Sequence, residues 1–384
     1  MDFSWSEEQT QLRSAVLELA REELNQGIVE RDREGEFNRA GWNKLAEFGV
    51  HGLPIPAEYG GAGLDALTTI GVLESLGHGC RDNGLIFSVN AHMWTVEIPL
   101  VDFGSDEQKQ RMLPKLLSGE WIGGNAMSEP ESGSDAYALT TRAELHGDHY
   151  KLNGSKTWVT NGGIADVLVV FATLDPEKGA RGITAFLVEK GSPGFEVGPK
   201  LQKMGLRTSP MNELFFNDCV VPVENRLGKE GAGSNLFTHS MTWERSSILA
   251  SAVGSMQRLL ETSIAYSRER KQFGKPIGNF QLVANKIVDM KLRVETARAL
   301  LYQAAWLRTL GRSIFLEAAL AKLHISESWV RCAEDALQLH GGYGYMEEAE
   351  IERELRDAIG SRIYSGTSEI QRMIIASLLG LRPE

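Results

Sequence analysis

The sequence predicts an α+β protein in which a β-rich middle segment separates two helical segments. Apolar residues recur at helical spacing before about residue 120 and again after about residue 231. Between them, short runs of β-branched and aromatic residues alternate with turn-forming residues. A chain of 384 residues is also too long for one ordinary hydrophobic core. We therefore expect an N-terminal helical domain over 1–120, a middle β domain over 121–230 and a C-terminal helical bundle over 231–384.

The first segment carries two signatures of helix starts. Ser6 and Gln9, and again Ser105 and Gln108, have the spacing of a capping box, in which each side chain bonds the other's backbone. Between these helices, residues 53–63 are rich in proline and glycine and are predicted to form a loop.

The middle segment is predicted to be a compact β domain, either a small barrel or a sandwich. The runs that carry this prediction are 150–152, 167–172, 183–188 and 213–216. Turn signals separate them, at Asn153-Gly154, at Asn161-Gly162-Gly163 and at 191–194.

The last segment is predicted to hold four or five long helices, several of them long enough for a bundle, with breaks at 274–276, Gly311 and Gly341-Gly342. The stretch 241–248 opens one of these helical patterns. Its apolar stripe, expected to face a core, consists of Leu249, Ala252, Val253, Met256, Leu259 and Leu260. Glu244 and Arg245 are therefore expected side by side near the start of a long helix, toward one flank of the stripe.

Composition excludes several classes of function. The formal net charge of −11 argues against nucleic acid and anionic membrane as main partners, although a local arginine cluster could still bind a phosphate-bearing ligand. The three cysteines form no CxxC pair and the histidines show no HExxH spacing, so neither a disulfide framework nor a metal site is expected. The first residues lack a signal-peptide pattern and no apolar run has membrane-spanning length, which predicts a cytoplasmic protein without membrane insertion.

Taken singly, the polar motifs allow ordinary structural interpretations. A glutamate such as Glu244 in a first helical turn is usually a solvated residue that the helix dipole favours. The loop 128–135 could hold a ring system or an amide, or could be only a turn. Trp158 at a strand end usually packs in a core. The basic cluster 268–274 would suit a pyrophosphate, or could complement a helix C-terminus. No GxGxxG or P-loop sequence is present.

In their order along the chain, however, these stretches resemble the acyl-CoA dehydrogenase family over essentially the whole length. The matching stretches are SEPESGSD (128–135), KTWVTNGG (156–163), KMGLRTS (203–209), RERKQFGKPIGNFQ (268–281), QLHGGYGYM (338–346) and YSGTSEIQR (364–372). The resemblance implies an N-terminal helical domain, a middle β domain and a C-terminal four-helix bundle. FAD is expected between the last two, in a site completed by a neighbouring subunit. A homotetramer is the expected assembly.

The resemblance also implies roles for residues at matching positions. Flavin contacts are expected from Met127, Ser128, Trp158 and Thr160. The adenosine diphosphate portion would be held across the subunit interface by Arg270, Phe273, Gln281, Gln338, Gly341 and Gly342, and the site would be completed by Thr367 and Glu369. Ser134 is expected near both the cofactor and the pantetheine arm of the substrate. The other expected substrate contacts are Arg245, Ser365 and Gly366.

One departure from the family pattern concerns the catalytic base. Many members carry glutamate directly after the tyrosine of the YxGT turn, but this chain has Ser365 there. The isovaleryl and long-chain branches instead place the base just before an arginine on the first C-terminal helix, which is Glu244 here. Glu244 would then remove the α-proton of a thioester while hydride passes from the β-carbon to flavin N5. The carbonyl would be polarised by a flavin hydroxyl and by the backbone N–H of Ser365.

The substrate is predicted from weaker similarities. Residues 77–92, the Trp243-Glu244-Arg245 triplet and Ser365 look like the branch that oxidises prolyl groups tethered to a peptidyl carrier protein. The alternative is a short- or branched-chain acyl-CoA dehydrogenase that passes electrons to an electron-transfer flavoprotein. A non-catalytic flavoprotein that binds acyl carriers and a flavin monooxygenase are further alternatives. Oxygen and an electron-transfer flavoprotein both remain open as the electron acceptor.

Overall fold

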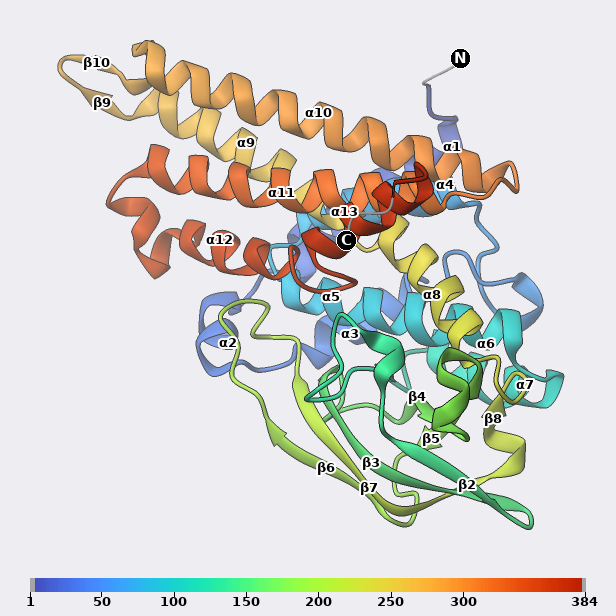
Figure 1. The fold of residues 1–384 in the computed structure, drawn as a ribbon. Coiled ribbons are helices and arrows are strands. Elements are labelled where there is room, and N and C mark those ends of the chain that lie inside the picture. Colours follow the sequence, from blue (N-terminus) through green and yellow to red (C-terminus); the bar gives the residue numbers. More distant parts are fainter. Residues whose placement is uncertain (1–3, 382–384) are drawn as a thin grey trace.

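The computed structural model describes residues 4–381, and its chain passes from helices to strands and back to helices (Figure 1). This order confirms the predicted fold class. The N-terminal helices are α1 (Glu7–Glu23), α2 (Ile28–Glu34), α3 (Arg39–Glu47), α4 (Ala66–Gly79), α5 (Asn83–His92), α6 (Ile98–Phe103) and α7 (Asp106–Leu117). Both predicted capping boxes are present, at the starts of α1 and α7. A five-residue π-helix, η2 (Met93–Glu97), joins α5 to α6.

The middle segment forms a mixed eight-stranded sheet with the order β6-β7-β3-β2-β4-β5-β8, and β1 pairs with β4. The strands are β1 (Gly123–Ala126), β2 (Arg142–His146), β3 (His149–Thr160), β4 (Val167–Thr173), β5 (Ile183–Glu189), β6 (Phe195–Lys200), β7 (Met211–Pro222) and β8 (Arg226–Leu227). All four predicted β-rich runs lie in these strands.

The turn predicted at Asn153-Gly154 is wrong. Both residues lie inside β3, where the register with β7 shifts between Leu152 and Gly154. Gly154 has a φ of 148°, and Asn153 exchanges hydrogen bonds with Asp218 on β7. A glycine that interrupts a strand in this way forms a bulge instead of ending the strand.

Strand β4 is buried along its whole length, on both faces. Val167, Val169 and Phe171 pack with α6, α7 and the start of α8 in one hydrophobic cluster. Leu168 and Val170, on the opposite face, pack in a second cluster with residues of β3 and β7. Alternate side chains of one strand thus serve two cores, because successive residues of a strand point to opposite faces.

The C-terminal helices are α8 (Gly233–Ser247), α9 (Ala250–Glu269), α10 (Gln281–Thr309), α11 (Phe315–His340), α12 (Ile351–Gly360) and α13 (Ser368–Leu378), with a short hairpin of β9 (Lys271–Gln272) and β10 (Lys275–Pro276). The long helices α9, α10 and α11 lie side by side (Figure 1). The six predicted stripe residues of α9 and its cap are all buried.

The expected position of Glu244 within its helix needs correction. The helical pattern breaks between Ser247 and Ala250, where Leu249 has φ −90° and ψ 7°. Glu244 therefore lies in the last turn of α8, not near the start of a long helix. A carboxylate at this end gains nothing from the helix dipole.

The N-terminal and C-terminal helical segments share one hydrophobic cluster. Helices α4 and α9 approach closely at two glycines: a Cβ on Gly77 or on Gly254 would lie 2.0 Å from a main-chain oxygen of the other helix. Neither position can accept a side chain without moving a helix. None of the helices within residues 4–381 combines the length and apolarity required to cross a membrane.

Candidate active site

A buried carboxylate lies where α8 meets the turn before α13. Glu244 is 8% exposed, and its Oε1 accepts a hydrogen bond of 2.5 Å from the hydroxyl of Ser365. Burial raises the pKa of Glu244, and the Ser365 hydroxyl, the Arg245 guanidinium and the Lys322 ammonium offset this only in part. A carboxylate whose pKa is raised is a stronger base when it is ionised, which suits it to proton abstraction.

The turn that carries Ser365 has an unusual backbone. Ser365 has a φ of 57° and Gly366 a φ of 89°, so two consecutive residues lie in the left-handed region. For serine this conformation costs about 1 kcal/mol. The surrounding structure must therefore hold it in place.

Three side chains from different elements hold this turn. Arg245 Nε donates to the carbonyl oxygen of Ser365 at 3.0 Å, and Gln371 Nε2 donates to the carbonyls of Ser365 and Gly366 at 3.2 and 3.0 Å. Lys322 Nζ, fully buried on α11, donates to Ser361 O at 2.8 Å and to Gly366 O at 2.7 Å. Burial, together with the nearby Arg245 guanidinium, lowers the pKa of Lys322 to about 8.

The sequence interpretation missed Lys322 and Gln371. The available signal for Lys322 was its place in the buried stripe of α11, where Ala318, Ile325 and Trp329 are its neighbours at helical spacing. A lysine is fully buried only when it is paired or hydrogen-bonded, so a lysine in an apolar stripe indicates a specific partner. Gln371, also fully buried, belongs to the quoted motif but had no assigned role.

Aromatic side chains pack around the site. Tyr364 contacts Phe87 of α5, with ring centroids 4.6 Å apart. Trp243 stacks on Trp94 of the π-helix, with centroids 5.7 Å apart, and the guanidinium of Arg308 lies 3.7 Å from the Trp243 ring centroid. Burial lowers the pKa of Arg308 to about 10. These contacts connect α8 to η2 and α10, and the turn that carries Ser365 to α5.

A first group of predicted flavin contacts lies at the ends of β1 and β3. Trp158 is 54% exposed with a φ of 55°, so the expectation of a core residue is not met. A Cβ on Gly133 would lie 3.6 Å from the Trp158 ring, which places the loop carrying Ser134 against it. Ser128 accepts a backbone bond from Thr157, the neighbour of Trp158, and Thr160 ends the same strand.

Beneath this group lies a buried ion pair. Lys156 Nζ is 2.8 Å from Glu129 Oε1 and 2.9 Å from the carbonyl oxygen of Met127. Glu129 also accepts bonds from the backbone of Thr140 and Thr141. The pair therefore joins β3 to the segment that carries Met127 and Ser128.

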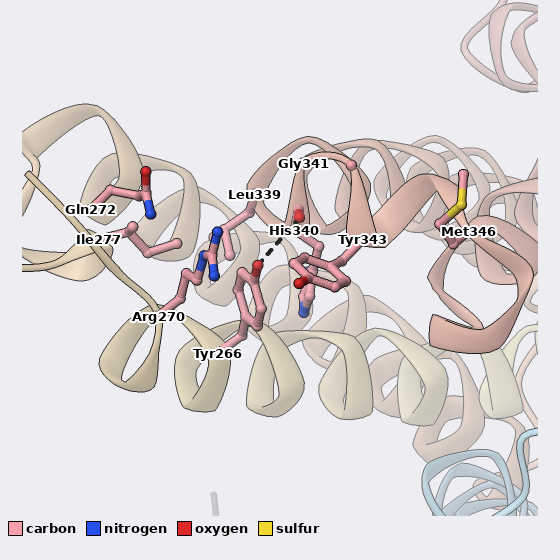
Figure 2. A pocket seen from close by; sticks show the side chains of 10 residues that line it. Tyr266, Arg270, Gln272, Ile277, Leu339, His340, Gly341, Tyr343 and Met346 are labelled. Carbon is pink, nitrogen blue, oxygen red and sulfur yellow. Dashed lines mark hydrogen bonds between the residues drawn. The ribbon is translucent and has the colours of Figure 1, made fainter.

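A second group lies at the opposite end of the C-terminal helices, away from Glu244 (Figure 1). Arg270, Gly341 and Gly342 line a pocket of about 560 Å³ together with Tyr266, His340 and Tyr343. Figure 2 shows the Arg270 side chain beside Tyr266, whose hydroxyl bonds the His340 carbonyl at 3.4 Å. The remaining predicted members are Phe273, 93% exposed in the β9–β10 hairpin, Gln281 at the first position of α10 and Gln338 in the last turn of α11.

Thr367 and Glu369 lie beside the turn that faces Glu244. Thr367 caps α13, its hydroxyl accepting from the backbone of Ile370 at 3.3 Å, and Glu369 lies in the first helical turn. The structure thus brings Glu244, Arg245, Ser365 and Gly366 into direct contact. It separates them from the group of Arg270 and Phe273 within one chain.

The chain matches three family models that together cover nearly its whole length. They describe the N-terminal domain of acyl-CoA dehydrogenase (residues 6–120), its middle domain (124–219) and its C-terminal domain (231–380). Among curated relatives, the chain is 44% identical to an L-prolyl peptidyl-carrier-protein dehydrogenase of Pseudomonas fluorescens, over 99% of this chain and 100% of the relative. It is 42% identical to a short-chain-specific acyl-CoA dehydrogenase of Clostridium acetobutylicum, over 98% and 99%.

Solved structures show the same similarity. The prolyl acyl carrier protein oxidase AnaB is 53% identical, with a TM-score of 0.97 over 98% of this chain and 100% of AnaB. PigA with FAD and proline is 42% identical, with a TM-score of 0.97 over 100% of both chains.

Proposed function

Because the chain belongs to the acyl-CoA dehydrogenase family, we propose that it uses FAD to dehydrogenate an acyl group held as a thioester. We propose prolyl on a peptidyl carrier protein as this acyl group. The observation that carries the proposal is the buried Glu244 carboxylate facing the Ser365 turn. Removal of a weakly acidic α-proton requires such a positioned base together with a donor for the developing oxygen charge.

In this proposal Glu244 takes the α-proton. The backbone N–H of Ser365 donates to no protein acceptor within the described residues 4–381, and we assign it to the thioester carbonyl. Removal of one such donor typically slows catalysis by about 10²–10³-fold. Arg245, buried beside the base and bonded to Ser365 O, holds the turn that presents this N–H. When bound, FAD supplies the acceptor for the hydride that leaves the β-carbon.

The residues present fit FAD. The exposed Trp158, held by a left-handed backbone at the mouth of the β domain, offers an apolar face to a ring system. In the pocket lined by Arg270, Gly341 and Gly342, the Arg270 guanidinium offers a cation for a phosphate. A Cβ at Gly341 or Gly342 would meet no atom within 4 Å, so a ligand can approach the backbone there closely. We assign Met127, Ser128, Ser134, Trp158 and Thr160 to the flavin end, and Arg270, Phe273, Gln281, Gln338, Gly341, Gly342, Thr367 and Glu369 to the remainder.

The residues assigned to the flavin end and those around Arg270 lie far apart in one chain. We therefore propose that a second copy of the chain completes each cofactor site. We propose a homotetramer that operates in the cytoplasm and leave oxygen and an electron-transfer flavoprotein as alternative electron acceptors. The prolyl substrate is supported by the similarity of the chain to an L-prolyl peptidyl-carrier-protein dehydrogenase and to the prolyl acyl carrier protein oxidase AnaB. It is also supported by Ser365, which leaves more room at its position than a glutamate would.

The proposal is tested by anaerobic flavin bleaching. The FAD-loaded enzyme is mixed with a prolyl-loaded carrier protein, with isovaleryl-CoA or with butyryl-CoA, and flavin absorbance is followed. We expect bleaching with the prolyl carrier and none with the CoA thioesters. Bleaching only with a CoA thioester would replace the proposed substrate by the short- or branched-chain acyl-CoA alternative. An oxygenated product in air, detected by mass spectrometry, would indicate a monooxygenase.

The role of the base is tested in the same assay. Glu244→Gln is expected to retain FAD and to lose bleaching nearly completely, because an amide cannot accept the proton. The matched control is Glu144→Gln, which changes an exposed carboxylate on β2 and should bleach at the wild-type rate. Unchanged bleaching in Glu244→Gln would refute the assignment of the base.

A further inference from the structure

We propose that Ser365 is a positioning residue for the Glu244 base: its hydroxyl orients the carboxylate and favours the ionised form by hydrogen bonding to it. This inference rests on the proposed role of Glu244. It assigns to the Ser365 side chain a function separate from that of its backbone N–H.

The first argument is geometric. Within residues 4–381, the 2.5 Å bond from Ser365 Oγ is the hydrogen bond that the Glu244 side chain accepts, and it occupies Oε1. Oε2 accepts no hydrogen bond within the same residues, and we assign it to the substrate proton. A carboxylate with one oxygen fixed cannot rotate freely, so the second oxygen is held in one orientation toward the α-proton.

The second argument concerns the surroundings of Glu244. Its neighbours with charge or titratable groups are Arg245 on the same helix, Lys322 on α11 and Tyr364 on the turn. Neither cation is within ion-pair distance of the carboxylate. Lys322 instead donates hydrogen bonds to two backbone carbonyls, and Arg245 Nε donates to a third. The direct contact to the buried charge is therefore a neutral hydroxyl. A hydrogen bond to the charged form favours that form, so the Ser365 hydroxyl opposes the effect of burial on the pKa of Glu244.

The third argument is that the hydroxyl cannot easily move away. Its backbone is held by Arg245, Gln371 and Lys322, from three different helices. The backbone that carries the hydroxyl is thus fixed close to the carboxylate. In the proposed step, the Cα–H bond breaks and the proton goes to Oε2 of Glu244. The electron pair of that bond forms the new double bond as the β-carbon loses its hydride to FAD.

The test that needs no substrate is infrared titration of the FAD-loaded enzyme. Protonated Glu244 is identified by the carbonyl band that Glu244→Gln lacks, and the midpoint of this band is followed against pH. In Ser365→Ala the midpoint should lie at higher pH than in the wild type, because the ionised carboxylate has lost its donor. Ser365→Gly should show the same displacement while it relieves the left-handed strain, which covers the case in which the alanine variant folds poorly.

The kinetic test uses kcat/KM for the thioester that bleaches the flavin. We expect Ser365→Ala to lose about tenfold at the acidic end of the profile. The loss should shrink as the pH rises and the base ionises in both proteins, and the part that remains at high pH reports the lost orientation of the carboxylate. The matched control is Ser368→Ala, which removes a 2.7 Å hydroxyl–carboxylate bond to Glu327 in the same segment and should leave the pH profile unchanged.

An unmoved infrared midpoint in both Ser365 variants, or an equal loss at every pH, overturns the inference. Failure of the proposed function looks different. If no thioester bleaches the flavin but the infrared midpoint moves as expected, then the Ser365–Glu244 coupling stands and the reaction assigned to the site is wrong.

Discussion

The ammonium of Lys156 lies in a fully buried position between the Glu129 carboxylate and the Met127 carbonyl. Burial alone would raise the pKa of Glu129, but the adjacent ammonium outweighs it and the pKa falls to about 2. Because folding lowers this pKa, the contribution of Glu129 to stability is present above its ordinary value of 4.5 and is lost as the pH falls toward about 2. Burial lowers the pKa of the partner Lys156 to about 8, so the ion pair is present between these two pKa values and is lost again as the pH rises through about 8.

Lys156→Met is expected to leave the Glu129 charge buried without its cation. Breaking a buried pair in this way costs about 3–5 kcal/mol, which should lower the thermal midpoint by several degrees. The measurement is thermal unfolding at pH 7, followed by circular dichroism. Lys151→Met, on the same strand but half-buried, is the control and should change stability by less than about 0.5 kcal/mol. Equal midpoints for the two variants would contradict the importance of the pair.

At the scale of single residues, the sequence indicated Glu244 as the candidate base but did not predict its surroundings. The carboxylate next to Arg245 and the serine at position 365 are both visible in the printed sequence. That their side chains bond each other depends on a contact across 121 residues, which no local pattern contains. Lys322 was missed for the same reason, because the backbone carbonyls that it bonds lie 39 and 44 residues away. Gln371 lies only six and five residues from the carbonyls that it bonds, but the side chain had no assigned role in the motif.

At the scale of elements, α10 presents apolar side chains away from its own core. Val288 and Leu292 are 64% and 61% exposed, on the side of the helix opposite to the buried Met290 and Val294. An exposed apolar face of this kind is typical of a surface that another subunit covers. It supports the proposed tetramer, in which long helices from separate copies would pack together.

Leu292→Lys is expected to weaken the tetramer, because a charge would be buried at the proposed contact without a partner. The molar mass measured by light scattering after size exclusion should fall from four chains toward two or one. Leu145→Lys changes a leucine that is 55% exposed on β2 and should leave the mass unchanged. A wild-type protein that elutes as a monomer would refute the assembly itself.

Elements with local signals were predicted well, and elements set by tertiary contacts were not. The capping boxes at Ser6 and Ser105 are local hydrogen-bond patterns, and both are present. The break between α8 and α9 contains neither glycine nor proline, and the π-helix of residues 93–97 has no distinctive composition. Asn153-Gly154 was read as a turn because this pair favours one, yet pairing of β3 with β7 overrides the preference.

At the scale of the whole molecule, α12 joins the three segments of the chain. Asp357 accepts the backbone N–H of Leu206, between β6 and β7, at 2.5 Å, and Asn83 of α5 at 3.1 Å. Arg356 bonds Asp32 of α2 at 2.6 Å. Burial raises the pKa of Asp357 to about 6, so the carboxyl is more easily protonated in the folded protein than in the unfolded chain.

The raised pKa of Asp357 determines how the stability of the folded protein changes with pH. Because folding raises the pKa of Asp357, its contribution to stability is fully present below its ordinary value of 3.8 and is lost as the pH rises through about 6. Asp357→Asn cannot titrate and should lack this component. Thermal midpoints measured from pH 4 to pH 7 should therefore fall less, or rise more, with pH in the variant than in the wild type. Parallel curves would show that Asp357 does not titrate in this range.

Because both faces of β4 are buried, the sheet cannot readily be produced as an isolated fragment. The strand Val167–Thr173 is an uninterrupted apolar run with a single polar residue at its end, and helices outside the middle segment cover one of its faces. A polypeptide limited to the sheet would expose this apolar face to water. Copies of it would then associate through their exposed apolar strands, and this aggregation would compete with folding. The smallest fragment that stays dispersed should therefore retain α6, α7 and the beginning of α8.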